Sequence, residues 1–222
     1  TKMSTQNKLW AGMAKETAHQ IGTPLSSLIG WVELLKLENI EESTVSEIEK
    51  DINRLQTITD RFSKIGSEPI LEKRDLIEET KNALDYLQTR VSKQILFTFS
   101  APDYPIYVAL NPSLHSWTIE NLVKNAIDAM RGKGHLDIAI SELENIVKIK
   151  ITDTGKGIPK NQFQKIFEPG FTTKKRGWGL GLSLTKRIVQ EYHKGKIKVA
   201  HSEIGKGTTI QISYKTAQKN LE

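Results

Sequence analysis

Residues 147–157 read Val-Lys-Ile-Lys-Ile-Thr-Asp-Thr-Gly-Lys-Gly. Val147, Ile149 and Ile151 alternate with polar residues, which is the pattern of a β-strand with one buried face. The strand ends beside Asp153, and two glycines follow it closely. Glycines let the backbone approach a ligand, but taken alone the stretch is more often an ordinary Asp-Thr-Gly turn. Its meaning therefore depends on the rest of the chain.

Short strands and helices surround this stretch. The patterns predict a helix over 76–87, strands over 95–99 and 106–110, a helix capped by Asn111-Pro112-Ser113 that reaches about Met130, and a closing hairpin of 197–200 and 208–213. These elements together predict an α/β two-layer sandwich.

The N-terminal part has a different pattern, with two apolar stripes at helical spacing. The first stripe is Leu9, Met13, Ile21, Leu25, Leu28, Val32 and Leu35, and the second is Val45, Ile48, Ile52, Leu55, Ile58, Phe62 and Ile65. The polar residues 38–43 separate them, so we expect a helical hairpin. Two helices enclose little apolar volume, so two hairpins are expected to form a four-helix bundle as a homodimer. Because Gly66-Ser67-Glu68-Pro69 breaks the second helix, we assign residues 1–67 to the hairpin domain and 68–222 to the sandwich domain.

Composition excludes several classes of protein. The chain of 222 residues has no cysteine, so it has no disulfide, thiolate metal site or cysteine nucleophile. No apolar run is long enough to span a membrane, so we expect no membrane contact by this fragment and a cytoplasmic location, either free or as part of an anchored sensor. The net charge is +6, but the lysines are spread along the sequence. A phosphate ligand and an acidic protein partner explain that charge without nucleic acid.

Five short islands occur in order in the second domain. They are Asn121-Leu-Val-Lys-Asn125-Ala-Ile-Asp128, Asp153-Thr-Gly155-Lys-Gly157, Phe167-Glu-Pro-Gly-Phe171-Thr-Thr-Lys174, Gly177-Trp-Gly179-Leu-Gly181-Leu and Gly205-Lys-Gly207-Thr208. In order and spacing they resemble the N, G1, F, G2 and G3 boxes of the histidine kinase family. That family's catalytic domain shares the ATP-binding fold of DNA gyrase, the mismatch-repair ATPases and a heat-shock chaperone. The resemblance implies a histidine kinase/gyrase-type ATPase fold and the cofactors ATP and Mg²⁺.

The resemblance also implies how the nucleotide is bound. Asp153 would accept the adenine N6 amino hydrogen, and Gly155 and Gly157 would let the backbone approach the ring. Asn121 and Asn125 lie four residues apart on one helix face, and Asn125 is the expected Mg²⁺ ligand. The remaining residues expected at the nucleotide are Asp128, Ile158, Phe167, Thr173, Gly177, Gly179, Leu180, Gly181, Leu182 and Thr208.

The stretch between Phe167 and Trp178 is rich in glycine, threonine and lysine, which suits a mobile lid. Phe167 and Phe171 would serve as its apolar latches, and Lys174 would reach the γ-phosphate. Backbone N–H groups of the glycine run that ends at Gly181 would surround the triphosphate.

The phosphoryl acceptor is expected in residues 18–25, Ala-His-Gln-Ile-Gly-Thr-Pro-Leu, which resemble the family's H box. His19 lies opposite the apolar stripe of its helix and should face solvent, where a neutral imidazole can attack phosphorus. Gln20 replaces the usual acid; it can orient the imidazole but cannot accept its proton. Thr23 matches the position that holds water for dephosphorylating a partner's aspartate. The other four histidines have no ligand-like spacing and are expected to be structural or exposed.

Three functions remain open. The first is an autokinase that phosphorylates His19 and passes the group to an aspartate on a response-regulator receiver domain. The second is a nucleotide-binding phosphatase or scaffold with weak kinase activity. Gln20 supports this alternative, because it replaces the usual acid. The third is a hydrolysing ATPase, but in the gyrase group the residue matching Asn121 is a glutamate that activates water, and an amide cannot act as that base.

Overall fold

The computed structural model describes residues 21, 24–38, 40–65, 69–88, 91, 93–171 and 181–217. The chain divides into two compact units, Thr1–Pro69 and Ile70–Glu222. Each unit is described by itself. In the part of the chain that the structure describes, no helix is long and apolar enough to cross a membrane.

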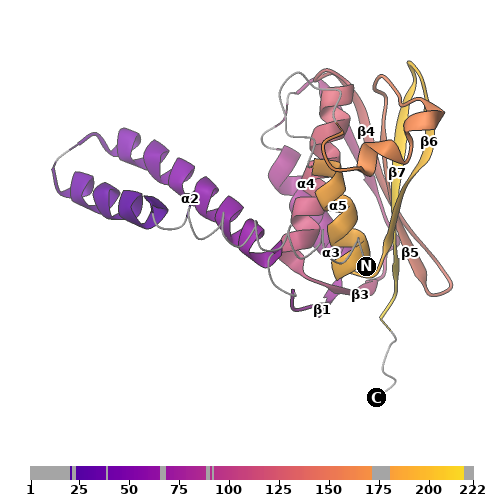
Figure 1. Ribbon diagram of the computed structural model, residues 1–222, viewed down its shortest axis with the longest axis horizontal. Coiled ribbons are helices and arrows are strands. Elements are labelled where there is room, and N and C mark those ends of the chain that lie inside the picture. Colours follow the sequence, from indigo (N-terminus) through magenta and orange to yellow (C-terminus); the bar gives the residue numbers. More distant parts are fainter. Residues whose placement is uncertain are drawn as a thin grey trace. The chain divides into compact units, whose positions relative to one another are not determined.

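The first unit is a helical hairpin, as the two apolar stripes predict. Residues 24–37 are helical, a turn follows, and the second helix, α2, spans Glu42–Ile65 (Figure 1). Leu25 and Val32 of the first helix pack with Val45 and Ile52 of α2, and all four are at most 6% exposed. Burial of these matched apolar positions therefore holds the two helices together.

Much of the apolar surface of this hairpin stays exposed. Eight large apolar residues on the two helices remain more than a third exposed, namely Leu28, Ile29, Trp31, Leu34, Leu37, Ile48, Leu55 and Ile58. Trp31, for example, is 62% exposed. An exposed apolar surface of this kind usually marks an interface.

The second unit is a sheet with helices on one side. The strands are β1 (Glu72–Asp75), β2 (Ile95–Ser100), β3 (Tyr107–Leu110), β4 (Gly134–Leu143), β5 (Ile146–Asp153), β6 (Lys196–Glu203) and β7 (Gly207–Lys215). The helices are α3 (Leu76–Gln88), α4 (Pro112–Ala129) and α5 (Gly181–Arg187), which continues as a π-helical stretch over Ile188–Tyr192. β1 pairs only with β3, while the main sheet has the order β2-β4-β5-β7-β6.

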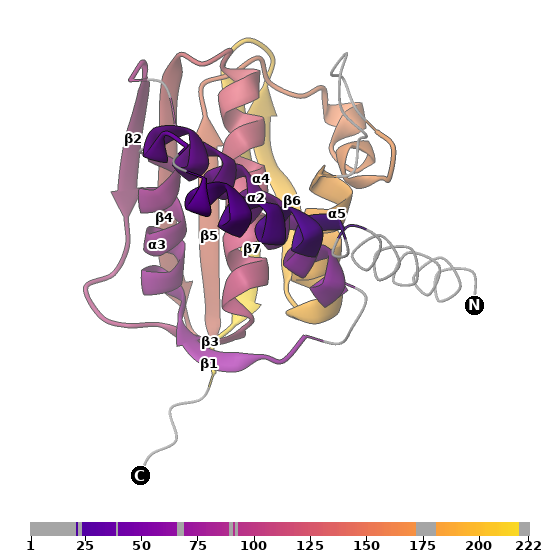
Figure 2. The same cartoon turned by 90° about the vertical axis from the view of Figure 1, so that its left-hand side faces the viewer.

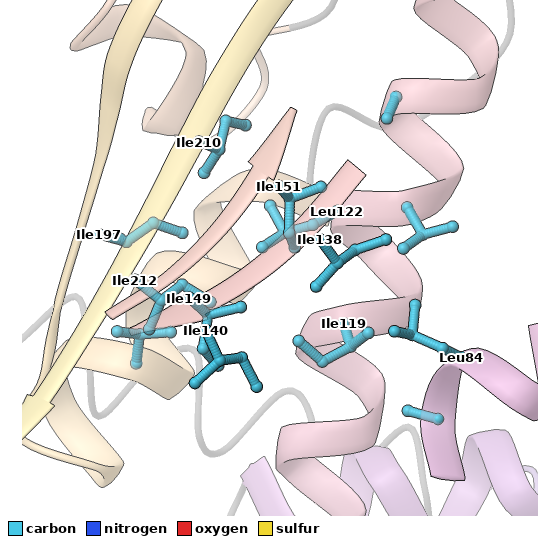
Figure 3. Close-up of a cluster of buried hydrophobic side chains, with 14 of the residues drawn as sticks. Leu84, Ile119, Leu122, Ile138, Ile140, Ile149, Ile151, Ile197, Ile210 and Ile212 are labelled. Carbon is cyan, nitrogen blue, oxygen red and sulfur yellow. The ribbon is translucent and has the colours of Figure 1, made fainter. Parts of the chain in front are cut away.

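The helices α3, α4 and α5 all lie on the same face of the main sheet (Figures 1 and 2). β2 runs parallel to β4, and the other neighbours in this sheet are antiparallel. Figure 3 shows the core between the two layers, where Ile119 and Leu122 of α4 face the strand residues Ile138, Ile149 and Ile151. These five side chains are at most 3% exposed. The predicted α/β two-layer sandwich is confirmed.

The start of α4 follows its sequence signal. Asn111 is the N-cap, its Oδ1 accepts a hydrogen bond from the Leu114 N–H at 3.1 Å, and Pro112 begins the helix. The Asn111 amide also donates to the Ile70 carbonyl at 3.1 Å. This cap therefore fixes where α4 begins and ties the first residue of the second unit to it.

Two strands were missed in the sequence. β4 carried a usable signal, because Leu136, Ile138 and Ile140 alternate with less buried residues. β1 carried none, since it consists of Glu72, Lys, Arg and Asp75 and pairs with β3 through its backbone. The Asp75 carboxylate then accepts the N–H groups of Ile77 and Ile106, which starts α3.

Two of the histidines, one within α4 and one just after the π-helical stretch, are buried against Tyr214 of β7. His115 is 0% exposed and its Nε2 lies 2.9 Å from the Thr80 hydroxyl oxygen. His193 accepts the Asn111 N–H at Nε2 and contacts the Ile188 carbonyl through Nδ1, both at 3.0 Å. The rings of both histidines meet Tyr214 edge-on. Burial is the main cause that lowers the pKa of both, that of His115 to about 3. Both are therefore neutral structural groups.

We predict that His115 makes the fold sensitive to acid. Its pKa is lower in the folded state, so the unfolded chain binds the proton first and stability falls as pH drops below ~6.5. His115→Gln keeps a polar group near Thr80 but does not titrate. Between pH 7 and pH 5 the free energy of unfolding of the variant should lose about 2 kcal/mol less than that of the original chain.

Urea denaturation at several pH values measures this difference. The exposed His201→Gln variant is the control and should keep the original pH dependence. Equal pH dependence in the original chain and His115→Gln would contradict the prediction.

Candidate functional site

The Asp153 carboxylate is the most deeply placed acid of the candidate site. Asp153 ends β5 between β4 and β7, where it pairs with Leu136 and Thr208, and is 8% exposed. Its Oδ1 accepts the Gly155 N–H at 2.8 Å, and the Thr208 N–H also donates to the carboxylate. Burial raises the pKa of Asp153, and these two backbone donors act against that rise. The carboxylate is thus buried, oriented and stabilised as an acceptor.

Two glycines allow the chain to close around this acid. A Cβ on Gly207 would lie 1.9 Å from the Asp153 carbonyl oxygen, and Gly207 has φ +131°. A Cβ on Gly157, at φ +76°, would lie 2.3 Å from the Glu203 carbonyl oxygen. Any side chain at either position would collide with backbone, so both glycines are required by close packing as well as by conformation.

Ser202 links the two glycine segments, and sequence reasoning missed it. Its Oγ accepts the Ile158 N–H at 2.8 Å and donates to the Gly207 carbonyl at 3.0 Å. The Thr208 hydroxyl lies 2.8 Å from the same oxygen. Ser202 thereby holds the loop after β5 against the β6–β7 hairpin. No motif signals this role, because it arises from the pairing of Ser202 with Thr208.

One face of α4 carries the three expected polar residues. Asn121, Asn125 and Asp128 lie within about 60° of one another around the helix. The Asn121 amide approaches the Thr185 hydroxyl at 3.5 Å, and that hydroxyl donates to the Gly181 carbonyl at 2.8 Å. This contact brings the first turn of α5 to the polar face of α4.

The other end of α4 meets the loop after β5. The Lys156 N–H donates to the Ala129 carbonyl at 3.1 Å. A Cβ on Gly155 would lie 2.7 Å from the Ala129 carbonyl carbon, so a glycine is needed there for close approach. The polar face of α4 therefore runs from the start of α5 towards the loop that follows Asp153.

Apolar residues surround these polar groups. Ile158 and Leu182 are partly buried and pack on the core. Phe167, expected as a lid latch, is 5% exposed and belongs to the core cluster, while Phe171 packs on it from a half-buried position. Phe167 therefore anchors the start of the segment that follows it.

The structure describes more than half of the predicted site residues. It brings together on α4, β5, β7, the start of α5 and the intervening loops Asn121, Asn125, Asp128, Asp153, Gly155, Gly157, Ile158, Phe167, Gly181, Leu182 and Thr208. Outside the described residues lie His19, Gln20, Thr23, Thr173, Lys174, Gly177, Gly179 and Leu180. The roles of both groups stay predictions.

A metal ion at this site would need ligands beyond charged side chains. In the described ranges no group of three or more His, Cys, Asp or Glu residues could hold a metal ion. The amide oxygens of Asn121 and Asn125 are hard donors of the kind Mg²⁺ accepts, and Mg²⁺ usually also binds substrate phosphates.

The two parts of the chain match two family models. Residues 10–68 match the His Kinase A (phospho-acceptor) domain, and residues 114–218 match the histidine kinase-, DNA gyrase B- and HSP90-like ATPase. Together the two matches cover more than half of the chain.

Relatives span nearly the whole chain. It is 33% identical to Sporulation kinase A of Bacillus subtilis (strain 168) over 96% of its own length and 35% of the relative. It is 32% identical to the sensor histidine kinase ZraS of Escherichia coli (strain K12), over 95% of its length and 47% of ZraS. The chain thus spans less than half the length of each of these relatives.

Solved structures show the same architecture. The mycobacterial sensor histidine kinase MprB superposes with a TM-score of 0.60 at 25% identity, covering 68% of this chain and all of that one. The catalytic domain of histidine kinase ThkA superposes with a TM-score of 0.59 at 27% identity, covering 65% of this chain and 95% of that one. Since its helical hairpin matches the phosphoacceptor domain and its sandwich matches the ATPase domain, the chain belongs to the two-component sensor histidine kinases.

Proposed function

We propose that this chain binds ATP between α4, the end of β5 and the β6–β7 hairpin, and transfers the γ-phosphoryl group to His19. The phosphoryl group then passes to an aspartate on a response-regulator receiver domain. The observation that carries the proposal is the Asp153 carboxylate, which is buried, held by two backbone N–H groups and flanked by glycines. The family match of both domains supports it.

Asp153 recognises the base in this proposal. Its carboxylate has acceptor positions beyond those used by Gly155 and Thr208, and one accepts the adenine N6 amino hydrogen. Because the site is largely removed from water, this hydrogen bond is stronger than an exposed one. Guanine presents a carbonyl oxygen at the same position and would face the carboxylate with like partial charge. Asp153 therefore selects adenine.

The polar face of α4 serves the phosphates. Asn125 is the proposed Mg²⁺ ligand, with Asn121 and Asp128 on the same face beside it. Bound Mg²⁺ would neutralise charge on the β- and γ-phosphates. The backbone around Gly177, Gly179 and Gly181 would surround the triphosphate, and Lys174 would contact its outer end. Asn121 also disfavours hydrolysis, because its amide cannot activate water as a base.

His19 is the proposed nucleophile. Its neutral Nε2 attacks the γ-phosphorus, the bond from that phosphorus to the bridging oxygen breaks, and ADP leaves. The proton on Nδ1 is then released to water, since Gln20 can orient the imidazole through its amide oxygen but cannot take the proton. Thr23, four residues after His19 in the sequence, is the proposed residue that would hold a water for dephosphorylating the regulator.

Dimerisation through the hairpin completes the proposal. A single hairpin buries Leu25, Val32, Val45 and Ile52 but leaves Trp31 and seven other large apolar residues of its helices more than a third exposed. A second copy packed around a two-fold axis would cover these residues in a four-helix bundle. The His Kinase A match over residues 10–68 supports this arrangement.

Autophosphorylation tests the proposal directly. Incubation with γ-labelled ATP and Mg²⁺ should give acid-labile, base-stable label on the chain, and His19→Ala should abolish it. The exposed His201→Ala variant is the control and should keep the label. Gln20→Glu should label at least ~10-fold faster, because a carboxylate can accept the imidazole proton.

Two outcomes would change the assignment. Measurable ATP binding without label would replace the kinase with a nucleotide-binding phosphatase or scaffold. Label that persists in His19→Ala would move the acceptor to another residue.

Asp153→Asn should weaken ATP binding by about 10- to 100-fold, the worth of a hydrogen bond to a charged group. It should also reduce the preference for ATP over GTP, because the new amide can donate to the guanine carbonyl. The control is Asp137→Asn on β4, a partly exposed residue whose carboxylate accepts from Thr98. Titration with fluorescent ATP and GTP analogues measures both values. Unchanged affinity and preference in Asp153→Asn would remove the base-recognition role.

A further inference from the structure

The main sheet has a second face, which carries a concentration of lysines. Along β5, β6 and β7 the residues facing the helices are buried, and the alternate residues face the other way. Five of those alternate residues are lysines, namely Lys148, Lys150, Lys196, Lys198 and Lys215. All are exposed except Lys148, which is partly exposed. The two lysines of β5 are far from those of β6 and β7 in sequence, and strand pairing gathers the three groups.

The register places four of these lysines in a regular array. Lys148 and Lys196 flank Ser213 from either side, and in the next row Lys150 and Lys198 flank Gln211. Since strands lie ~4.8 Å apart and alternate residues ~7 Å apart, the four Cα positions mark a rectangle of about 7 by 10 Å.

The polar residue at the centre of this array is unusually covered. Gln211 is only 8% exposed although it points away from the helices, and its amide donates to the Ser213 hydroxyl at 3.2 Å. The register places Lys150 and Lys198 on both sides of it, within reach of their alkyl stems. The ammonium groups therefore extend outward from a closed surface.

These charges are not neutralised within the described part of the chain. None of the five lysines has an ion pair with a described residue. The nearest carboxylate in the register is Asp137, diagonal to Lys150, and it accepts a hydrogen bond from Thr98. Glu144 lies in the β4–β5 turn at the edge of the array. The centre of the face is thus positive, with acids only at its margins.

An apolar edge adjoins the array. Leu143 and Ile146 pair with each other in the row next to Lys148, on the same face, and Leu143 is 70% exposed. A basic surface with an adjacent exposed aliphatic side chain suits a partner that has a negatively charged surface with an apolar layer beneath it.

The residue types distinguish between possible anionic partners. Among its described residues the face has no Phe, Tyr or Trp on which bases could stack and no arginine for bidentate phosphate or base contacts. The imidazole of His201, which pairs with Thr209, lies outside the lysine array, so this composition disfavours nucleic acid. Lysine is depleted at the centres of protein interfaces, which disfavours a tight protein partner. The lysine ammonium group is compact and strongly hydrated, so it can be attracted to an anionic surface while it keeps its bound water.

We propose that this sheet face docks on the surface of a membrane that contains anionic lipids. The sequence expectation of no membrane contact rests on the absence of a spanning segment and does not address peripheral binding of this kind. Asp153 projects from the opposite face of the sheet, so nucleotide and lipid surface can be bound together. Docking would hold the second unit at a bilayer without a further anchor.

Sedimentation with lipid vesicles tests the proposal. The chain should bind vesicles of phosphatidylcholine mixed with phosphatidylglycerol and should not bind pure phosphatidylcholine. The variant with Lys148, Lys150, Lys196 and Lys198 all changed to Gln should bind at least ~30-fold more weakly, since each lysine near an anionic surface contributes up to about five-fold. Salt near 0.5 M should release the original chain, because the Debye length falls below ~5 Å.

The matched control removes the same charge elsewhere, at the exposed residues Lys81, Lys93, Lys160 and Lys165. That variant should bind vesicles as the original chain does, and both variants should keep ATP affinity, which shows that they fold. Equal loss in both variants would reduce the effect to net charge and overturn the proposal. Failure of the original chain to bind anionic vesicles would overturn it too, and so would binding of single-stranded DNA by this face in place of lipid.

Discussion

The contact between Gly207 and the end of β5 is the constraint on which the site depends. β7 can follow β5 to its last residue only because Gly207 has no side chain to collide with the Asp153 carbonyl. That pairing brings the Thr208 N–H to the Asp153 carboxylate and the Gly207 carbonyl to Ser202. The Ser202 hydroxyl in turn accepts the Ile158 N–H. The absence of a side chain at Gly207 therefore allows the contacts that join the loop after β5 to the β6–β7 hairpin.

The same constraint explains an electrostatic compromise. Burial disfavours the charged form of Asp153, and the backbone N–H groups of Gly155 and Thr208 act against it. A buried carboxylate with unused acceptor capacity is costly for a stable fold and useful for a binding site. His115 and His193 differ from Asp153, because burial lowers their pKa values and keeps both side chains neutral, and both serve packing.

Periodicity predicted α3, α4, β5 and the β6–β7 hairpin, because α4 and β5 each bury one face of a regular pattern, but the alternation in the central strand β4 was overlooked. It could not predict β1, whose charged residues pair through the backbone, and the parallel pairing of β2 with β4 depends on contacts distant in sequence. The residue types of the nucleotide site were readable from their motifs. The role of Ser202 was not, since it arises from the register between β6 and β7. The lysine array is equally invisible along the chain, because strand order alone brings Lys150 and Lys198 to either side of Gln211.

Two glycines in the same turn allow the most direct test of this organisation. Both have positive φ, but a Cβ on Gly205 meets nothing within 4 Å, whereas a Cβ on Gly207 would lie 1.9 Å from the Asp153 carbonyl oxygen. Titration of ATP into Gly205→Ala and Gly207→Ala, with thermal unfolding of each, separates backbone strain from the loss of the close contact. Gly205→Ala should bind ATP within a few-fold of the original chain, while Gly207→Ala should lose at least ~30-fold because Asp153 is displaced. Equal ATP affinity in the two variants would contradict the dependence of the site on this contact.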